Sequence, residues 1–229
     1  MINIILFINF CFPLHIETYN ISFDRSVVEF DTIIDSYSGD LFSNKEFLFV
    51  DINFPINQNF IIRGSKTILY YPDEGKAISI STDSYPVVPF FNTLKAFSIE
   101  DFGLSKKGYI LDSTRVSSDN KSIISYWTPP KEQSEYINKL ELLIKQNNIV
   151  SLNSFNERND MISSIQFYKI NEYNKIFLPS EIKFTNRDAI GRVTTETIII
   201  NKMIINAPLP KEIMDFKLPD NIEIEAVEW

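Results

Sequence analysis

Apolar and polar side chains alternate with the period of a β-strand along much of this chain, most clearly between residues 47 and 81. Four short alternating runs lie there, each bounded by residues that are typical of tight turns. These turn segments are Pro55–Gln58, Arg63–Ser65 and Pro72–Gly75. Gly64 and Gly75 can take the positive φ that such turns often need. The pattern predicts four consecutive antiparallel strands.

A helical pattern follows these strands in Pro86–Phe97. Pro86 and Pro89 suit the first turn of a helix, where a backbone N–H is not needed. The apolar side chains that recur at helical spacing are Val87, Phe90, Phe91, Leu94 and Phe97. A second short helical turn is expected at Ile99–Leu104. Because this helix has so few other elements to pack against, we expect it to be a lid that covers a curved sheet. Such an arrangement can enclose an apolar ligand. The alternative is an ordinary amphipathic helix on a packed core.

Strand patterns also dominate the rest of the chain. Ser26–Ser36 is expected to form one strand with Val28, Phe30 and Ile34 on one side. Later strands are expected at Ile123–Trp127, Ile162–Asn171, Pro179–Thr185 and Arg192–Ile205, with hairpin turns at Asn147-Asn148 and Asn156–Asp160. The segment Tyr136–Ile144 fits a helix and a strand equally well by periodicity alone.

Residues 1–16 contain no Lys, Arg, Asp or Glu and are too few to span a membrane in the usual way. This run is typical of the apolar region of a secretory signal or anchor, although it has no basic start and no small-residue cleavage site. A first strand or a core helix is the alternative, and Cys11 could become a lipidated residue after cleavage. Residues 17–229 contain no repeat or linker, and we expect them to form one domain.

Charge and composition exclude several functions. The formal net charge of −8 argues against binding a phosphate backbone, so no nucleic-acid partner is expected. The single His is His15 and the single Cys is Cys11, both in the N-terminal run, so a His-based triad or a zinc site in the body is not expected. Acidic pairs such as Asp73-Glu74 are typical of solvated turns. We therefore expect no enzyme, cofactor or metal site, with a carboxylate-dyad hydrolase as a distant alternative.

Several short motifs occur in an order that resembles one family. These are S-G-D-L at Ser38–Leu41, P-x(7)-R-G-S-K-T-x(3)-Y-P-D from Pro55 to Asp73, P-x-x-P-F-F-x-x-L at Pro86–Leu94, and F-K-L-P at Phe216–Pro219. Together they resemble the periplasmic lipoprotein carriers of the LolA type, in the LolA/LolB-like superfamily. The resemblance extends over roughly residues 28–224.

The resemblance implies a mainly β fold, a strongly curved and incompletely closed antiparallel β barrel with a small helical lid. It also favours a strand for Tyr136–Ile144. The cavity of the family holds acyl chains, and here the alternating positions imply that it is lined by Leu48, Val50, Ile52, Phe54, Phe60, Ile62, Leu69, Ile78 and Ile80. The lid would close it with Phe90, Phe91, Leu94 and Phe97.

By the same resemblance, the protein would be a monomeric periplasmic chaperone that carries acylated lipoproteins from the inner to the outer membrane. Its partners would be an inner-membrane lipoprotein-releasing transporter and, in some versions of the pathway, an outer-membrane receptor. The alternative is a membrane-tethered receptor of the LolB kind, or an envelope-stress regulatory module on the same fold.

The sequence departs from the family pattern in two places. Asn44, followed by Lys45, stands where many carriers have an arginine that is linked to directional release, and Val50 stands where an aromatic residue often follows. His15–Phe23 resembles a strand or an extended chain rather than the amphipathic helix with which family members begin. Release and part of the lid are therefore expected to differ here.

Overall fold

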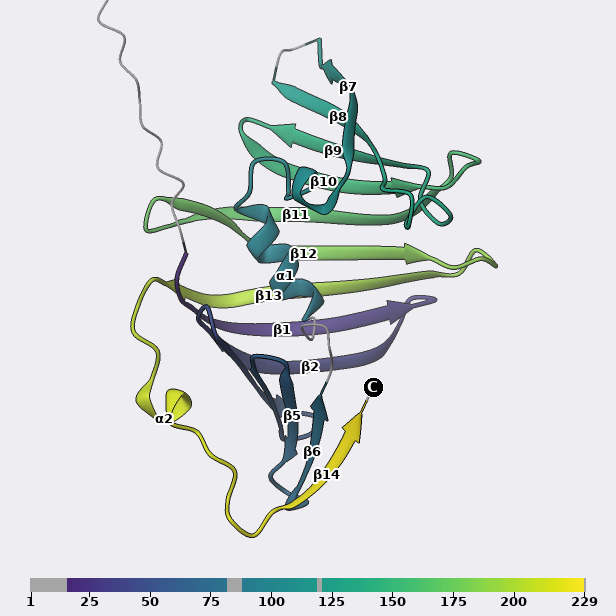
Figure 1. The fold of residues 1–229 in the computed structure, drawn as a ribbon. Helices are drawn as coiled ribbons and strands as arrows, with labels where there is room; N and C mark the ends of the chain where they lie inside the picture. Colours follow the sequence, from purple (N-terminus) through teal and green to yellow (C-terminus); the bar gives the residue numbers. More distant parts are fainter. Residues whose placement is uncertain (1–15, 82–87, 119–120, 229) are drawn as a thin grey trace, which may run out of the picture.

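The computed structural model describes residues 16–81, 88–118 and 121–228. In these residues a single sheet of 14 strands curves around one helix, α1 (Figure 1). The strands, in chain order, are β1 (Tyr19–Glu29), β2 (Thr32–Ser43), β3 (Phe47–Phe54), β4 (Gln58–Arg63), β5 (Lys66–Tyr71), β6 (Lys76–Ser81), β7 (Ile110–Val116), β8 (Ser122–Thr128), β9 (Lys139–Lys145), β10 (Asn148–Phe155), β11 (Met161–Tyr173), β12 (Ile176–Arg187), β13 (Val193–Ile205) and β14 (Glu223–Glu228). The helical elements are α1 (Pro89–Phe97), a 3₁₀ turn at Ser105–Lys107 and α2 (Lys211–Met214).

The sheet does not close into a barrel. Its strand order is β14-β6-β5-β4-β3-β2-β1-β13-β12-β11-β10-β9-β8-β7, so β14 and β7 are its two edges. Neighbouring strands are antiparallel except β14 and β6, which run parallel. This confirms the expected fold class, a mainly β, curved and incompletely closed sheet with a small helix.

The four strands predicted between residues 47 and 81 are confirmed as β3 to β6. Gly64 and Gly75 lie in the turns with φ of 59° and 64°, the left-handed conformation that these turns require. The ambiguous segment that ends at Ile144 is the strand β9, and the chain reverses at Gln146 and Asn147, which both have positive φ. The other predicted strands of the second half correspond to β8, β11, β12 and β13.

The single strand expected at Ser26–Ser36 is wrong. The chain reverses inside this segment, at Phe30 and Asp31, whose φ angles of 47° and 59° form a two-residue turn between β1 and β2. Such turns match the right-handed twist of the flanking strands. Phe30 is 75% exposed at the tip and Ile34 is 55% exposed, so these residues do not form a buried face with Val28.

The short helical turn expected at Ile99–Leu104 is also wrong. Phe102 and Gly103 both have positive φ, which ends regular right-handed helix, and these residues form irregular turns before the 3₁₀ turn at Ser105–Lys107. The preceding helix begins at Pro89, and Pro86 lies outside the described residues.

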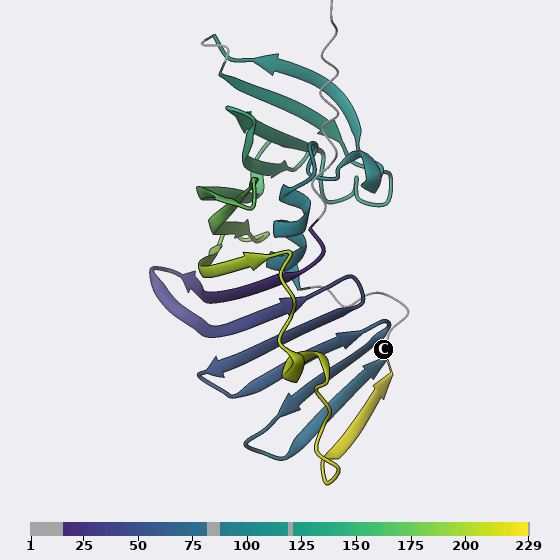
Figure 2. The same ribbon diagram turned by 90° about the vertical axis from the view of Figure 1, so that its left-hand side faces the viewer.

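The helix α1 defines the inner face of the sheet. Figures 1 and 2 show it lying across the central strands. Its side chains pack on these strands. The ring of Tyr19 on β1 lies 5.1 Å from that of Phe91, and the ring of Phe167 on β11 lies 4.8 Å from that of Phe97. Leu94 is fully buried between them. The main core therefore lies between α1 and the inner face.

The outer face carries a second, smaller core. In β3, Phe47 and Phe49 point away from α1 because successive side chains of a strand alternate between faces. Residues 206–222, here called the C-terminal strap, cross this face with α2 and place the ring of Phe216 5.1 Å from that of Phe49 (Figure 2). The strap then leads into β14, which pairs with β6. The strands near β3 are therefore covered on both faces.

Residues 1–15 lie outside the described residues, so the predicted signal or anchor segment stays a prediction. In the described part of the chain, no helix is long and apolar enough to cross a membrane.

Candidate functional site

Most of the residues predicted to line a cavity lie together on the inner face. The strand registers place Leu48 opposite Ile62 and Val50 opposite Phe60, and then Phe60 opposite Leu69. The next strand continues the row, because Leu69 pairs with Ile78 and Thr67 pairs with Ile80. Side chains that are paired across strands share a face. The result is an apolar wall from β3 to β6, which is continuous through Val50, Phe60, Leu69 and Ile78 and contains the polar Thr67 in the neighbouring row.

Burial along this wall falls with distance from α1. Leu48, Val50 and Ile62 are buried in the main core. The members of the wall that are half-buried are Ile52, Phe60, Leu69, Ile78 and Ile80. In the part of the chain that the structure describes, α1 therefore covers one end of the wall and leaves apolar side chains partly open at the other.

Phe54 is the exception among the predicted lining residues. The register between β2 and β3 shifts by one residue, so that Asn53 has no partner and Phe54 lies opposite Ser38 on the outer face. Phe54 is 58% exposed and borders a shallow outer groove beside Ser38 and Ile199. The structure therefore separates Phe54 from the inner wall.

The predicted lid side chains all point into the core. Phe90, Phe91, Leu94 and Phe97 are buried, and they fill the middle of the inner face. The ring of Phe90 lies against that of Phe23 on β1. On the solvent side, the Lys95 ammonium lies 5.0 Å from the centre of the Phe91 ring. In this structure α1 acts as a plug that divides the inner face.

A second apolar wall, which the sequence analysis did not identify, lies on the far side of α1. Val116 on β7 pairs with Ile123 on β8, which in turn pairs with Ile144 on β9. Val116 and Ile123 are exposed, and Ile144 is half-buried. The alternation in β8 and β9 was visible in the sequence, but β7 was not predicted, so the wall could not be assembled.

A charged cluster adjoins the apolar inner face near Phe23. The Arg25 guanidinium donates from Nε to Glu196 Oε1 at 2.7 Å and from Nη1 to Asp35 Oδ2 at 2.5 Å. It also lies over the ring of Tyr37, 4.9 Å from its centre, and that ring contacts Phe23. Burial is the main cause that raises the pKa of Tyr37 above its ordinary value. This cluster gives the inner face a polar end.

The described residues show apolar surface on the inner face rather than a cluster of metal-ligating side chains. Among them, no group of three or more His, Cys, Asp or Glu side chains is placed to hold a metal ion. His15 lies outside the described residues. What the inner face offers to a ligand is apolar contact, which is non-directional and depends on the area that is covered.

Comparison with known proteins identifies the fold. No family model and no curated protein matches the sequence. Among solved structures, a DUF1329 family protein from Desulfovibrio piger superposes with a TM-score of 0.59 at 11% identity, over 87% of this chain and 90% of that one. A LolA superfamily protein from Nitrosomonas europaea gives 0.53 at 13% identity, over 86% and 90%.

A third similar structure is described as an outer membrane lipoprotein-sorting protein domain from Vibrio parahaemolyticus. Its TM-score is 0.57 at 10% identity, over 87% of this chain and 89% of that one. At such low identities these likenesses establish the fold alone. The protein has a LolA-like fold, an open curved β-sheet with a helix on its inner face, as the sequence motifs indicated.

Proposed function

We propose that this protein is a carrier that binds acyl chains of lipoproteins on the inner face of its sheet. The observation on which this rests is the continuous apolar wall from β3 to β6, half-buried at Phe60, Leu69 and Ile78. A wall of this kind can bind a hydrocarbon chain without specific hydrogen bonds. The LolA-like fold supports the proposal.

The energetics of acyl chains require such a wall. Each CH₂ that leaves water contributes about 0.8 kcal/mol, so the chains of one lipoprotein amount to tens of kcal/mol. A lipoprotein with exposed chains would not cross an aqueous space without a carrier. Contacts from branched and aromatic side chains that are only half-buried suit a ligand that must later be released, because they impose no single packing arrangement.

The proposal places the protein in the periplasm, between an inner-membrane lipoprotein-releasing transporter and an acceptor at the outer membrane. The support is the description of the Vibrio parahaemolyticus structure as a lipoprotein-sorting domain. In this role the protein acts by binding and transfer, without a catalytic step. Residues 1–16 would direct it to that compartment.

Binding of a triacylated cysteinyl peptide to the purified protein tests the proposal. Leu69→Glu places a carboxylate in the middle of the inner wall and is expected to weaken binding at least tenfold, because a charge beside a hydrocarbon chain must be desolvated. The matched control is Phe54→Glu, which makes a similar change on the outer face. It is expected to bind like the unchanged protein.

Three outcomes would contradict the carrier proposal. If the peptide does not bind, or if both variants lose binding equally, the inner wall is not the acyl site. If the peptide binds through Leu69 but is never passed to acceptor vesicles, the protein is a receptor or a sensor rather than a carrier.

A further inference from the structure

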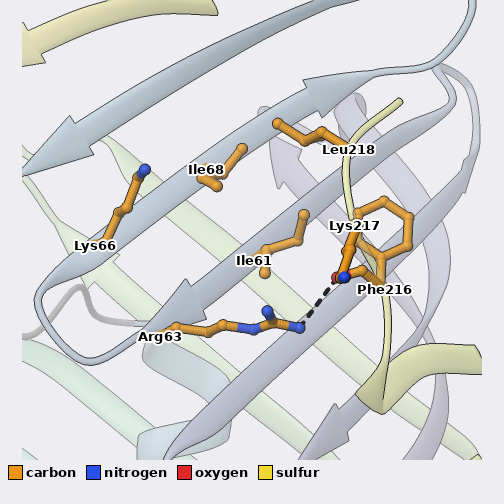
Figure 3. A pocket seen from close by; sticks show the side chains of 7 residues that line it. All are labelled: Ile61, Arg63, Lys66, Ile68, Phe216, Lys217 and Leu218. Carbon is orange, nitrogen blue, oxygen red and sulfur yellow. Dashed lines mark hydrogen bonds between the residues drawn. The ribbon is translucent and has the colours of Figure 1, made fainter. Parts of the chain in front are cut away.

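A separate groove of about 330 Å³ lies on the outer face, on the opposite side of the sheet from the acyl wall (Figure 3). Its floor consists of Ile61 on β4 and Ile68 on β5, which are paired across the two strands. Phe216 and Leu218 of the C-terminal strap form one wall. The rim carries three cationic side chains, Arg63, Lys66 and Lys217.

Contacts with the strands hold the strap wall in place. Arg63 Nη2 donates to the backbone carbonyls of Met214 and Phe216, each at 3.2 Å. The Phe216 ring packs on Phe49 and lies 6.3 Å from the ring of Tyr70. The groove is therefore a built feature of the fold, made where the strap crosses β4 and β5.

In the part of the chain that the structure describes, the charges around the groove lack counterions. Arg63 and Lys66 stand directly opposite each other in the β4–β5 ladder, and like charges in that position destabilise a sheet. Among the described residues, the ion pairs with Asp or Glu include none of Arg63, Lys66 and Lys217. This concentration of positive charge occurs in a chain whose net charge is −8. An anionic group at the rim would relieve the repulsion and gain charge-assisted hydrogen bonds.

We propose that this groove is a second binding site, for a small single-chain amphiphile that bears one carboxylate or phosphate. Its apolar part would lie on Ile61, Ile68 and Leu218, and its anionic group would bind to the rim cations. The volume is at the lower end of the range for small-molecule pockets, about 300–1,000 Å³, so one chain fits and the several chains of a lipoprotein do not. The site is independent of the proposed carrier function.

Calorimetric titration with decanoate and with decyl phosphate tests this site, with decyltrimethylammonium as the cationic control. We expect one anion per groove and weaker binding as salt increases, because the rim is exposed. Lys66→Glu and Lys217→Glu are both changes at exposed positions and should each weaken binding of both anions at least tenfold. The cation should not bind at this site.

The inner-face variant Leu69→Glu distinguishes binding in this groove from binding at the acyl wall. Leu69→Glu should leave decanoate binding at the groove unchanged, and the amide signals of Lys66 and Leu218 should shift on titration in that variant. Unchanged affinity in Lys66→Glu and Lys217→Glu would overturn the proposal. It would also be overturned if these variants lost binding to phosphatidylglycerol vesicles while neither soluble anion bound, because the groove would then be a membrane-contact surface.

Discussion

The ring of Phe90 on α1 lies 4.8 Å from the ring of Phe23 on β1, with an angle of 45° between the ring planes. Both side chains are buried, and together they join the one helix of the inner face to the first strand of the sheet. The contact lies at the middle of the inner face, between the two apolar walls. The position of α1 therefore decides whether these walls are separate or continuous.

Removing the Phe90 ring is expected to destabilise the protein. Phe90→Ala leaves a cavity in the main core, and such changes typically cost about 3–5 kcal/mol in free energy of unfolding. Urea denaturation measures the loss. Phe54→Ala, at an exposed position, should change stability by less than about 0.5 kcal/mol. Equal stability of the two variants would mean that α1 is not docked as the structure shows.

Acyl binding is expected to displace α1. Phe90, Phe91 and Leu94 fill the centre of the inner face, so a long chain can use both walls only if the helix moves. Hydrogen exchange of the Asn92 amide, which donates to the Val88 carbonyl at 3.0 Å, should therefore become faster when the triacylated peptide is bound. Amides of β12 provide the reference that should not change. Slower exchange at Asn92 would show instead that α1 closes over the chain.

Much of the fold follows from local patterns, whereas two features of the candidate site depend on contacts between separate segments. The strands β3 to β6 and the helix α1 were predictable because alternation, turn residues and helical spacing are local signals. The side of the sheet on which Phe54 lies could not be predicted, because it depends on a register shift against β2. The cluster around Arg25 could not be predicted either, since its partner Glu196 is 171 residues away.

Replacing Arg25 should expose the repulsion within its cluster. Arg25→Met keeps the aliphatic stem but leaves Asp35 and Glu196 without their cation. Exposed pairs contribute about 1 kcal/mol or less, and breaking a fully buried pair costs about 3–5 kcal/mol. Arg25 is 18% exposed, so we expect a loss of about 2 kcal/mol in free energy of unfolding.

A double-mutant cycle isolates this interaction from the packing of the stem. Glu196→Gln in the Arg25→Met background should recover part of the lost stability, although the same change in the unaltered protein should be destabilising. Additive effects of the two substitutions would show that the ion pair contributes nothing to folding.

Asp51 should make the protein less stable at neutral pH. Burial is the main cause that raises the pKa of its carboxyl above the ordinary value of 3.8, and the neighbouring charge of Asp40 acts in the same direction. The folded state therefore binds the proton more tightly than the unfolded chain does. The contribution of Asp51 to the free energy of unfolding is therefore most favourable below the ordinary pKa of the carboxyl, and it is lost as the pH rises through the raised pKa.

Asp51→Asn removes this cost while keeping the acceptor oxygen that Asn59 Nδ2 contacts at 2.7 Å. The variant should be more stable than the unchanged protein at pH 7, by up to about 1 kcal/mol because the site is half-buried, and the gain should disappear near pH 3.5. Asp220→Asn, at an exposed position, should show no gain at either pH. A gain that is constant with pH would exclude the carboxyl as its source.

The two edges of the sheet differ in how well they resist pairing with another chain. The β14 edge carries Glu223 and Glu225, and charged side chains protect an edge strand from further pairing. The residues of β7 are exposed on both faces and include Ile110, Leu111 and Val116. Exposed apolar edge strands are sites of self-association.

Self-association at high protein concentration should therefore proceed through β7. Leu111→Lys places a charge on that edge and should reduce the associated fraction in sedimentation-velocity experiments, with little effect on stability because the side chain is half exposed. The matched control is Ile224→Lys on β14, also an exposed apolar position, which should leave association unchanged because glutamates already protect that edge. If Ile224→Lys is the more effective of the two, the parallel β14 edge is the site of pairing, and the charges on it are not sufficient to prevent it.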